Sequence, residues 1–244
     1  MQPVPKVALV TGAARRVGKT VAQMLAHAGC AVAVHYRTSA GDARKLVRSL
    51  NAASLRAAAF QADLSKVAEI RRLVQRVEKQ MGPIGILVNS ASVFFPTPVF
   101  SVTERNWDGI LSANLKSVFF LSTEVARRMV RRKAGVIVNI EDAAVHRPYL
   151  RHAPYLVSKA GVAMLTRVLA MEFGPHIRVA GVSPGPVLLP EHFGKAERQK
   201  AVRRTVLKRE GNAADVAKAV VFLANEANYT TGTTIFVDGG RSVA

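Results

Sequence analysis

The stretch that decides the fold is Val7-Ala-Leu-Val-Thr-Gly-Ala-Ala-Arg-Arg-Val-Gly-Lys19. Its first four residues form a short apolar run that predicts a buried strand, and a helical pattern begins at Gly18. Gly12 permits a tight turn between the two, and Gly18 lets the helix pack closely. Backbone amides at a helix N-terminus attract anions, so the turn suits a pyrophosphate group.

The rest of the chain repeats this alternation of short apolar strands and helices. We expect strands at 7–10, 31–36, 55–60, 84–88, 136–140, 177–182 and 234–237. We expect helices at 18–28, 42–51, 67–81, 105–133 (in two pieces), 154–173 and 213–224, with a mobile helical insertion at 190–208. This order predicts a parallel sheet with helices on both faces, joined by right-handed crossovers. Residues 1–244 are therefore expected to form a single α/β domain, a Rossmann-like doubly wound fold.

In this setting the first turn favours dinucleotide binding over an ordinary strand-to-helix connection. An NAD site usually carries an acid about 20 residues past the glycines. The corresponding segment here, Val34-His-Tyr-Arg-Thr-Ser39, has none. It offers Arg37, Thr38 and Ser39, with Arg15 and Arg16 in the facing turn, and cations and hydroxyls suit a 2′-phosphate. We predict NADPH/NADP as the cofactor; solvated surface arginines are the alternative.

Composition and charge limit the class of protein. Hydrophobic residues make up 49% of the chain, which argues against disorder, and the single cysteine excludes an intramolecular disulfide. No apolar run approaches the roughly 18 residues that span a bilayer, and the N-terminal apolar stretch is too short for a signal peptide. We expect a soluble cytoplasmic protein that does not bind membranes.

The net charge of +19, from 35 Lys and Arg against 16 Asp and Glu, has two interpretations. One is a surface for nucleic acid or an acidic membrane. The other, favoured because the positive charges are scattered, is a generally basic protein with an anionic cofactor. The densest group lies at the end of a predicted helix, where cations suit the helix dipole or a solvated face: Arg127, Arg128, Arg131, Arg132 and Lys133.

A candidate catalytic pair lies in Tyr155-Leu-Val-Ser-Lys159. Four-residue spacing places Tyr155 and Lys159 on one helix face, where the ammonium is expected to lower the pKa of the phenol. Tyr155 would then donate a proton near neutral pH. Asp142 lies thirteen residues before the tyrosine.

Over essentially its whole length the chain resembles the short-chain dehydrogenases/reductases. The resemblance rests on Thr11-Gly12 with Gly18, Asp63-Leu64, Asn89-Ser-Ala91, Asn114, Tyr155 with Lys159, Ser183-Pro-Gly185 and Val237-Asp-Gly-Gly240. It implies the strand order 3-2-1-4-5-6-7 and a homotetramer.

The resemblance also assigns roles by position. Asn114 would hold a water in a proton relay, and Lys159 would bind the nicotinamide ribose and lower the pKa of Tyr155. Asp63 and Leu64 would flank the adenine. The full set of expected cofactor-binding residues is Gly12, Arg15, Arg16, Val17, Gly18, His35, Tyr36, Arg37, Thr38, Ser39, Asp63, Leu64, Asn89, Ser90, Ala91, Tyr155, Lys159, Pro184 and Gly185.

Two residues depart from the usual family pattern: Arg16 replaces a glycine of the turn, and Asp142 replaces a serine. Both changes also occur in pteridine reductases, and the chain is similar to these enzymes. Further matches are His35-Tyr36 and Asn89-Ser-Ala-Ser-Val-Phe-Phe-Pro-Thr-Pro98. That similarity implies that Phe94 stacks a pterin on the nicotinamide. The expected catalytic residues are Asn114, Asp142, Tyr155 and Lys159, and the expected substrate-binding residues are Arg16, Ser92, Phe94, Asp142 and Tyr155.

The chemistry of a C=N bond agrees with this assignment. Hydride reaches carbon while a proton must reach nitrogen, and a carboxyl group or a water that it orients can deliver that proton. The alternative for Asp142 is a helix cap or a surface acid, and the alternative for Phe94, next to Phe95, is packing in the core. The spacing selects Asp142 over Glu141.

Three functions remain open on the sequence. The first is reduction of a pterin or folate, the second is reduction of another carbonyl or imine such as an oxoacyl thioester or sugar, and the third is nucleic-acid binding on a dinucleotide-fold scaffold. Tyr155, Lys159 and Asn114 argue against the third, because a scaffold does not require them. Residues 186–208 are expected to cover the substrate. We predict no metal site, because four histidines lack ligand spacing: His146, His152, His176 and His192.

Overall fold

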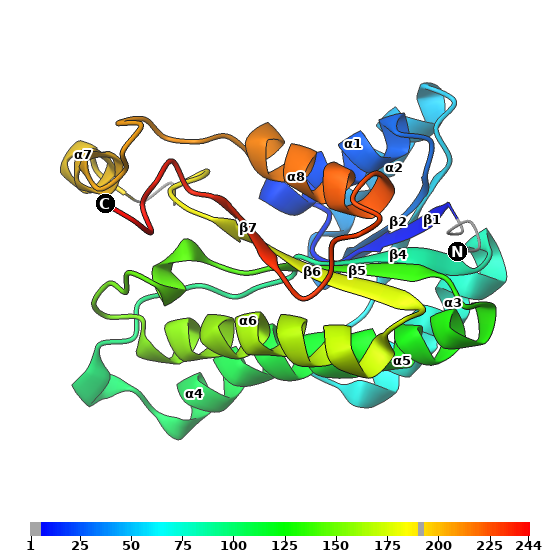
Figure 1. Ribbon diagram of the computed structural model, residues 1–244, viewed down its shortest axis with the longest axis horizontal. Helices are drawn as coiled ribbons and strands as arrows, with labels where there is room; N and C mark the ends of the chain where they lie inside the picture. The colour runs from blue at the N-terminus through cyan, green and yellow to red at the C-terminus, as the bar shows by residue number, and fades with distance from the viewer. Residues whose placement is uncertain (1–5, 190–192) are drawn as a thin grey trace.

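The computed structural model describes residues 6–189 and 193–244. It contains one seven-stranded parallel sheet with the order β3-β2-β1-β4-β5-β6-β7 (Figure 1). The strands are β1 Val7–Val10, β2 Ala31–Tyr36, β3 Ala57–Gln61, β4 Ile84–Asn89, β5 Gly135–Ile140, β6 Ile177–Pro184 and β7 Thr234–Val237. The predicted fold class and strand order are confirmed.

Helices cover both faces of this sheet. The α-helices are α1 Arg16–His27, α2 Ala40–Ala52, α3 Val67–Met81, α4 Glu104–Leu111, α5 Ser117–Arg132, α6 Ala153–Phe173, α7 Lys195–Arg203 and α8 Ala213–Asn225. Short helical turns lie at η1 Val99–Ser101, η2 Ser112–Lys116 and η3 Ala143–Val145. In Figure 1, α1, α2 and α8 lie on one side of the sheet, and α3, α5 and α6 lie on the other.

Each face has its own apolar core, because residues of a buried strand point alternately to the two sides. On one side Val10, Val34 and Val138 pack beneath α1, α2 and α8. On the other side Leu9 and Ile137 pack beneath α3, α5 and α6. Strands buried on both faces explain the nearly continuous apolar runs in the sequence.

Two differences from the expected elements are local. The third strand begins at Ala57 and not at Leu55, because the Leu55 amide still donates to the Leu50 carbonyl at the end of α2. The long helical region forms two pieces as expected, α4 and α5, which are joined by a π-helical turn, Ser112–Lys116. The predicted insertion contains α7 and continues to residue 208 without regular structure, and its residues 190–192 lie outside the described part of the chain.

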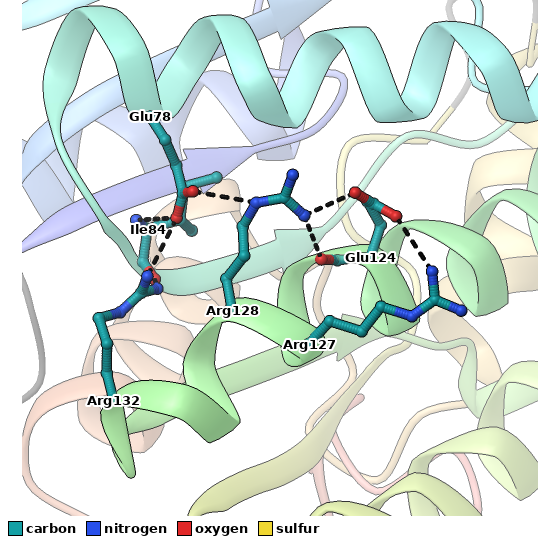
Figure 2. A network of polar contacts seen from close by, with 6 residues as sticks. All are labelled: Glu78, Ile84, Glu124, Arg127, Arg128 and Arg132. Carbon is teal, nitrogen blue, oxygen red and sulfur yellow. Dashed lines mark hydrogen bonds and ion pairs between the residues drawn. The ribbon is translucent and has the colours of Figure 1, made fainter.

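Two arginines of the densest basic group, Arg128 and Arg132, are partly buried and bind other parts of the protein (Figure 2). Arg128 binds Glu78 of α3 at 3.0 Å and Glu124 of its own helix at 2.5 Å. Arg132 binds Glu78 at 3.3 Å and donates to the Ile84 carbonyl at 2.8 Å. These arginines therefore join α3 to α5 and to the start of β4, which gives them a structural role that does not need a nucleic acid.

Two searches of the described residues bear on partners. They contain no helix long and apolar enough to cross a membrane. Nor do the described ranges bring three or more His, Cys, Asp or Glu side chains together in a way that could hold a metal ion.

Candidate active site

The first turn is held by a buried histidine. The Gly12 amide donates to His35 Nδ1 at 3.1 Å, so Nδ1 is unprotonated, and Nε2 donates to the Ala62 carbonyl at 3.1 Å. Burial is the main reason that the pKa of His35 is lowered to about 4. Both ring nitrogens are therefore occupied inside the protein, so any contact of His35 with a cofactor must come from its backbone.

Thr11 joins this turn to the loop after β4. Its hydroxyl donates to the Val88 carbonyl and accepts from the amides of Ser90 and Ala91 at 2.9 and 3.0 Å. The neighbouring strands β1 and β4 lie where the chain changes direction across the sheet, the position at which doubly wound folds bind ligands. One hydroxyl thus fixes the two backbone segments that border this crevice.

The two glycines of the turn leave no room for a side chain. A Cβ on Gly12 would lie 2.9 Å from Ala91 Cα, and one on Gly18 would lie 2.5 Å from the Gly12 carbonyl oxygen. Gly12 also has φ of +63°, which L-residues rarely adopt. The close approach of bare backbone at a helix N-terminus fits a pyrophosphate, so the residues present fit a dinucleotide.

The arginines of the turn have protein partners. Arg15 Nε pairs with Asp42 Oδ2 of α2 at 2.5 Å. Asp42 is therefore neutralised next to the exposed Arg37 and Thr38, where a ribose substituent is expected. Arg16 donates to the Leu188 carbonyl, so it connects the turn to the segment after β6. Its expected contacts with cofactor and substrate stay predictions.

Two further predicted cofactor residues use their side chains for contacts within the protein. Asn89 is buried and donates to Ser122 Oγ at 3.0 Å and to Asn139 Oδ1 at 2.8 Å. Asp63 is partly exposed, and one of its carboxylate oxygens accepts from the Ser65 amide and hydroxyl, at 3.0 and 2.8 Å. Their contacts with a cofactor stay predictions.

The remaining residues of the predicted cofactor set line the same edge. Gly185 packs on the tail after β7, because a Cβ there would lie 2.6 Å from Asp238 Cα. Leu64 is buried, while Val17, Tyr36, Ser39 and Pro184 are partly exposed at or just past the ends of strands or of the first turn.

Asp142 and Tyr155 are brought together in the candidate site. The Tyr155 hydroxyl donates to Asp142 Oδ2 at 2.7 Å, and Asp142 Oδ1 accepts from the Ala144 amide at 2.8 Å. Asp142 thus caps η3 and also contacts the tyrosine, and its catalytic role stays a prediction. Burial raises the pKa of Asp142 above its ordinary value, against the opposing effect of the tyrosine hydrogen bond.

The expectation of a lowered phenol pKa is wrong for the protein without ligands. Burial and the Asp142 charge hold the pKa of Tyr155 well above its ordinary value of 10. The Lys159 ammonium lies 5.8 Å from the centre of the tyrosine ring and donates to the Ile140 carbonyl at 2.9 Å. Burial lowers the pKa of Lys159. Tyr155 is therefore a neutral hydroxyl, the form that can give up a proton.

Asn114 lies in the π-helical turn between α4 and α5. Its side-chain oxygen accepts from the Val93 amide at 2.8 Å, and its nitrogen contacts the Val93 carbonyl at 3.0 Å and Ser158 Oγ at 3.2 Å. Asn114 thus fixes the loop that carries Phe94 and the helix that carries Tyr155. π-helical turns are frequent at functional sites. Its predicted water-holding role stays a prediction.

Phe94 is not a core residue, because its side chain is 36% exposed. One ring face stacks on His152, with centroids 4.5 Å apart and an interplanar angle of 7°. Tyr155 approaches edge-on at 4.8 Å, and Tyr149 at 6.3 Å. The phenylalanine therefore borders the Asp142–Tyr155 pair, and Ser92 on the same loop is exposed.

Sequence reasoning missed the surroundings of this pair. Tyr149 and His152 support Phe94, but their loop has no periodic pattern that would indicate it. Glu141 is buried, and its two carboxylate oxygens accept from Thr166 Oγ1 at 2.8 Å and Thr234 Oγ1 at 3.0 Å. Only the chain position of Glu141, next to Asp142 and after a buried strand, could have indicated a second carboxylate beneath the site.

Comparison with known proteins establishes the family. Residues 12–242 match the family described as enoyl-(acyl carrier protein) reductase. The 3-oxoacyl-[acyl-carrier-protein] reductase FabG of Staphylococcus epidermidis is 34% identical over 239 residues, which cover 96% of this chain and 98% of that one. The chain belongs to the short-chain dehydrogenase/reductase family and is an oxidoreductase of that family.

Solved structures of similar proteins have different substrates. A protein of Agrobacterium tumefaciens assigned as a gluconate dehydrogenase matches with a TM-score of 0.92 and 31% identity, covering 98% of this chain and 96% of that one. FolM alternative dihydrofolate reductase 1 from Brucella canis, in complex with NADP, matches with a TM-score of 0.91 and 31% identity, covering 98% and 94%. The substrate must therefore be argued from the residues of the site.

Proposed function

We propose that the protein reduces a pteridine, a dihydropterin or dihydrofolate, to the tetrahydro form with NADPH. The observation that carries the proposal is the 2.7 Å hydrogen bond between Tyr155 and Asp142, a carboxyl group where the family usually has a serine. Reduction of a carbonyl and reduction of a C=N bond each consume one proton, at oxygen and at nitrogen respectively, but a serine is a poor proton source for an imine nitrogen. A pair of proton-carrying groups suits the second reaction.

The residues act in a definite arrangement. The reduced nicotinamide, when bound, supplies the hydride for the carbon of the C=N bond. Tyr155 and Asp142 share a hydrogen-bonded proton next to the nitrogen, and burial raises the pKa of both groups above their ordinary values. Lys159 presents its ammonium from beneath, held by the Ile140 carbonyl. The proton is replaced from solvent after each turnover.

Phe94 supports a flat substrate. His152 covers one face of its ring and fixes the ring plane. A heteroaromatic bicycle can stack on the remaining face, close to the Tyr155 hydroxyl. A small aliphatic ketone would gain little from this platform.

The choice of NADPH over NADH rests on charge near the adenine ribose. Arg37, Thr38 and Ser39 follow β2, and the next acid along the chain, Asp42, is paired with Arg15 at 2.5 Å. Bidentate, charge-assisted contacts to a 2′-phosphate suit guanidinium groups. The FolM structure from Brucella canis was determined in complex with NADP, which supports the same choice.

A second candidate is reduction of a different carbonyl, such as an oxoacyl thioester. The 34% identity to the FabG enzyme of Staphylococcus epidermidis favours it. The main argument against carbonyl reduction is Asp142, a carboxyl group at the position where the family usually has a serine. We also propose a homotetramer, because large apolar side chains of α5 and α6 are exposed in the single chain.

The test is NADPH oxidation with dihydrobiopterin, dihydrofolate, dihydromonapterin and a panel of simple ketones, for the wild type and Asp142→Ser. We expect Asp142→Ser to lower pterin turnover by about 10²-fold or more, because a proton-handling group is lost. We expect ketone reduction, where present, to change less or to rise. The pH profile of the variant should lose one ionisation.

Circular dichroism of both proteins checks that the variant folds, and NADH in place of NADPH tests the cofactor choice. Unchanged pterin turnover in Asp142→Ser would remove the argument for a C=N substrate and return the protein to the carbonyl reductases.

A further inference from the structure

A basic pocket of about 320 Å³ lies beside the candidate active site. Three separate parts of the chain meet there: the loop after η3, the end of α7 and the tail after β7. The lining residues are His146, Arg147, Pro148, Arg204 and Arg241.

In the described part of the chain the arginines of this pocket have no carboxylate within ion-pair distance, and the Asp142 charge acts on Arg241 from beyond that distance. Within residues 6–189 and 193–244, no ion pair involves Arg147, Arg204 or Arg241. Arg241 is only 8% exposed and contacts the Arg147 carbonyl at 3.4 Å. Its burial and the neighbouring Arg204 charge lower the pKa of Arg241. Like charges brought together in this way favour binding of an anion.

The pocket is also close to the reacting groups. Asp142 caps η3, and His146 follows that turn directly. The loop from His146 continues to Tyr149, whose ring lies 6.3 Å from that of Phe94. The charge of Arg241 acts on the pKa of Asp142. The loop between Asp142 and Tyr155 thus contributes both to the pocket, through His146, Arg147 and Pro148, and to the surroundings of Phe94, through Tyr149.

We propose that this pocket holds a negatively charged tail of the substrate, a carboxylate or a phosphate, while the reducible ring lies against Phe94. This inference rests on the proposed function and narrows it to anionic substrates. Among pteridines it selects a folate, whose glutamyl group carries carboxylates, over dihydrobiopterin, whose side chain is uncharged. A phosphate would enter the same pocket if the substrate were a thioester on a phosphate-bearing carrier.

Arg204 provides a suitable test, because it is exposed and its loss should not disturb the core. The variants are Arg204→Gln and, as the matched control, Arg203→Gln, which removes the same charge one residue away and outside the pocket lining. Three substrates are compared: dihydrofolate has a carboxylate tail, dihydrobiopterin has no charged tail, and acetoacetyl-CoA has a phosphate tail. Calorimetric binding of p-aminobenzoyl-glutamate to the NADP-loaded enzyme gives a readout without turnover.

We expect Arg204→Gln to raise the ratio of the dihydrofolate KM to the dihydrobiopterin KM about tenfold, the effect of one charge-assisted contact. Binding of p-aminobenzoyl-glutamate should weaken by a similar factor, and Arg203→Gln should leave both quantities unchanged.

The possible failures are distinct. If both pterins are reduced and the KM ratio does not change, the pocket proposal is overturned and the pteridine function stands. If only acetoacetyl-CoA is reduced and its KM rises in Arg204→Gln, the pteridine function is overturned and the pocket holds a phosphate. If acetoacetyl-CoA alone is reduced, with an unchanged KM and fragment binding, both proposals are overturned.

Discussion

At the scale of single residues, Tyr155 and Asp142 shift each other's pKa. The tyrosine hydroxyl donates to the carboxylate, and the carboxylate charge, after burial, helps to keep the hydroxyl protonated. A tyrosine four residues before a lysine indicated the pair in the sequence, but the sequence could not show that Lys159 would bond to a backbone carbonyl. The direction of the tyrosine pKa shift therefore required the structure.

Replacing Tyr155 by Phe removes the proton and keeps the ring that packs on Phe94. We expect kcat to fall by about 10²–10⁴-fold, the usual contribution of general acid catalysis, with NADPH binding nearly unchanged. Stopped-flow turnover and fluorescence titration of NADPH measure the two quantities. A variant that keeps more than a tenth of the wild-type kcat would show that Tyr155 is not the proton donor.

His35 makes the first turn sensitive to acid. With a pKa of about 4 in the folded protein and about 6.5 unfolded, its contribution to stability is present above pH 6.5 and is lost as pH falls toward 4. The loss reaches about 3 kcal/mol, of which 1.36 kcal/mol accompanies each pKa unit. Protonated Nδ1 would face the Gly12 amide, while Arg76 and Asp63 are the charged groups that act on the ring from outside.

His35→Asn is the variant for comparison. The asparagine side-chain oxygen can still accept a hydrogen bond from the Gly12 amide, and asparagine does not titrate. We expect the wild type to lose its stability advantage over the variant between pH 7.5 and 4.5, measured by urea unfolding at each pH. An advantage that is constant across this range would contradict a buried neutral histidine.

At the scale of elements, the sequence predicted most of the sheet correctly because its strands are buried on both faces. The bounds of β1, β2, α3 and β7 agree with the apolar runs. Three features could not be predicted, because they depend on contacts across the fold. They are the π-helical turn that orients Asn114, the hydrogen bonds of the Thr11 hydroxyl to the loop after β4, and the loop that brings His152 against Phe94. These features have no local pattern, because they join residues far apart in the chain.

The ion-pair network between α3 and α5 offers a test with an internal control. Arg128→Ala removes the shorter ion pair of two partly buried carboxylates, those of Glu78 and Glu124, at 21% and 12% exposure. Each keeps one longer contact, Glu78 with Arg132 and Glu124 with Arg127. We expect a loss of about 2 kcal/mol in unfolding free energy. Arg127 lies 3.6 Å from Glu124 but is 66% exposed, so Arg127→Ala should cost less than about 0.5 kcal/mol.

Urea unfolding of both variants measures the difference. Equal losses for Arg127→Ala and Arg128→Ala would mean that the network adds no more stability than ordinary surface pairs.

At the scale of the whole molecule, α5 and α6 lie side by side on the outer face of the sheet (Figure 1). They carry large apolar side chains that a single chain leaves in water, notably Phe119 at 40%, Met164 at 56% and Met171 at 84% exposure. Several large apolar side chains exposed on two neighbouring helices are typical of an interface between subunits.

We therefore expect Met164→Glu to convert the proposed tetramer into smaller species, because the substitution places a charge in an apolar contact. Multi-angle light scattering measures the mass, and Lys79→Glu, on the exposed side of α3, is the control. A tetramer that survives Met164→Glu, or a wild type that is monomeric at micromolar concentration, would exclude this face as the interface.

The parallel direction of all seven strands has a consequence for how such a protein can diverge. Thr11, Asn89 and Asp142 lie at or just past the carboxyl ends of their strands, whereas the network around Ile84 lies at an amino end. Selection can therefore act on the two edges separately. Loops at one edge can acquire a new substrate preference with little loss of stability, while substitutions at the other edge can raise heat tolerance and leave that preference untouched.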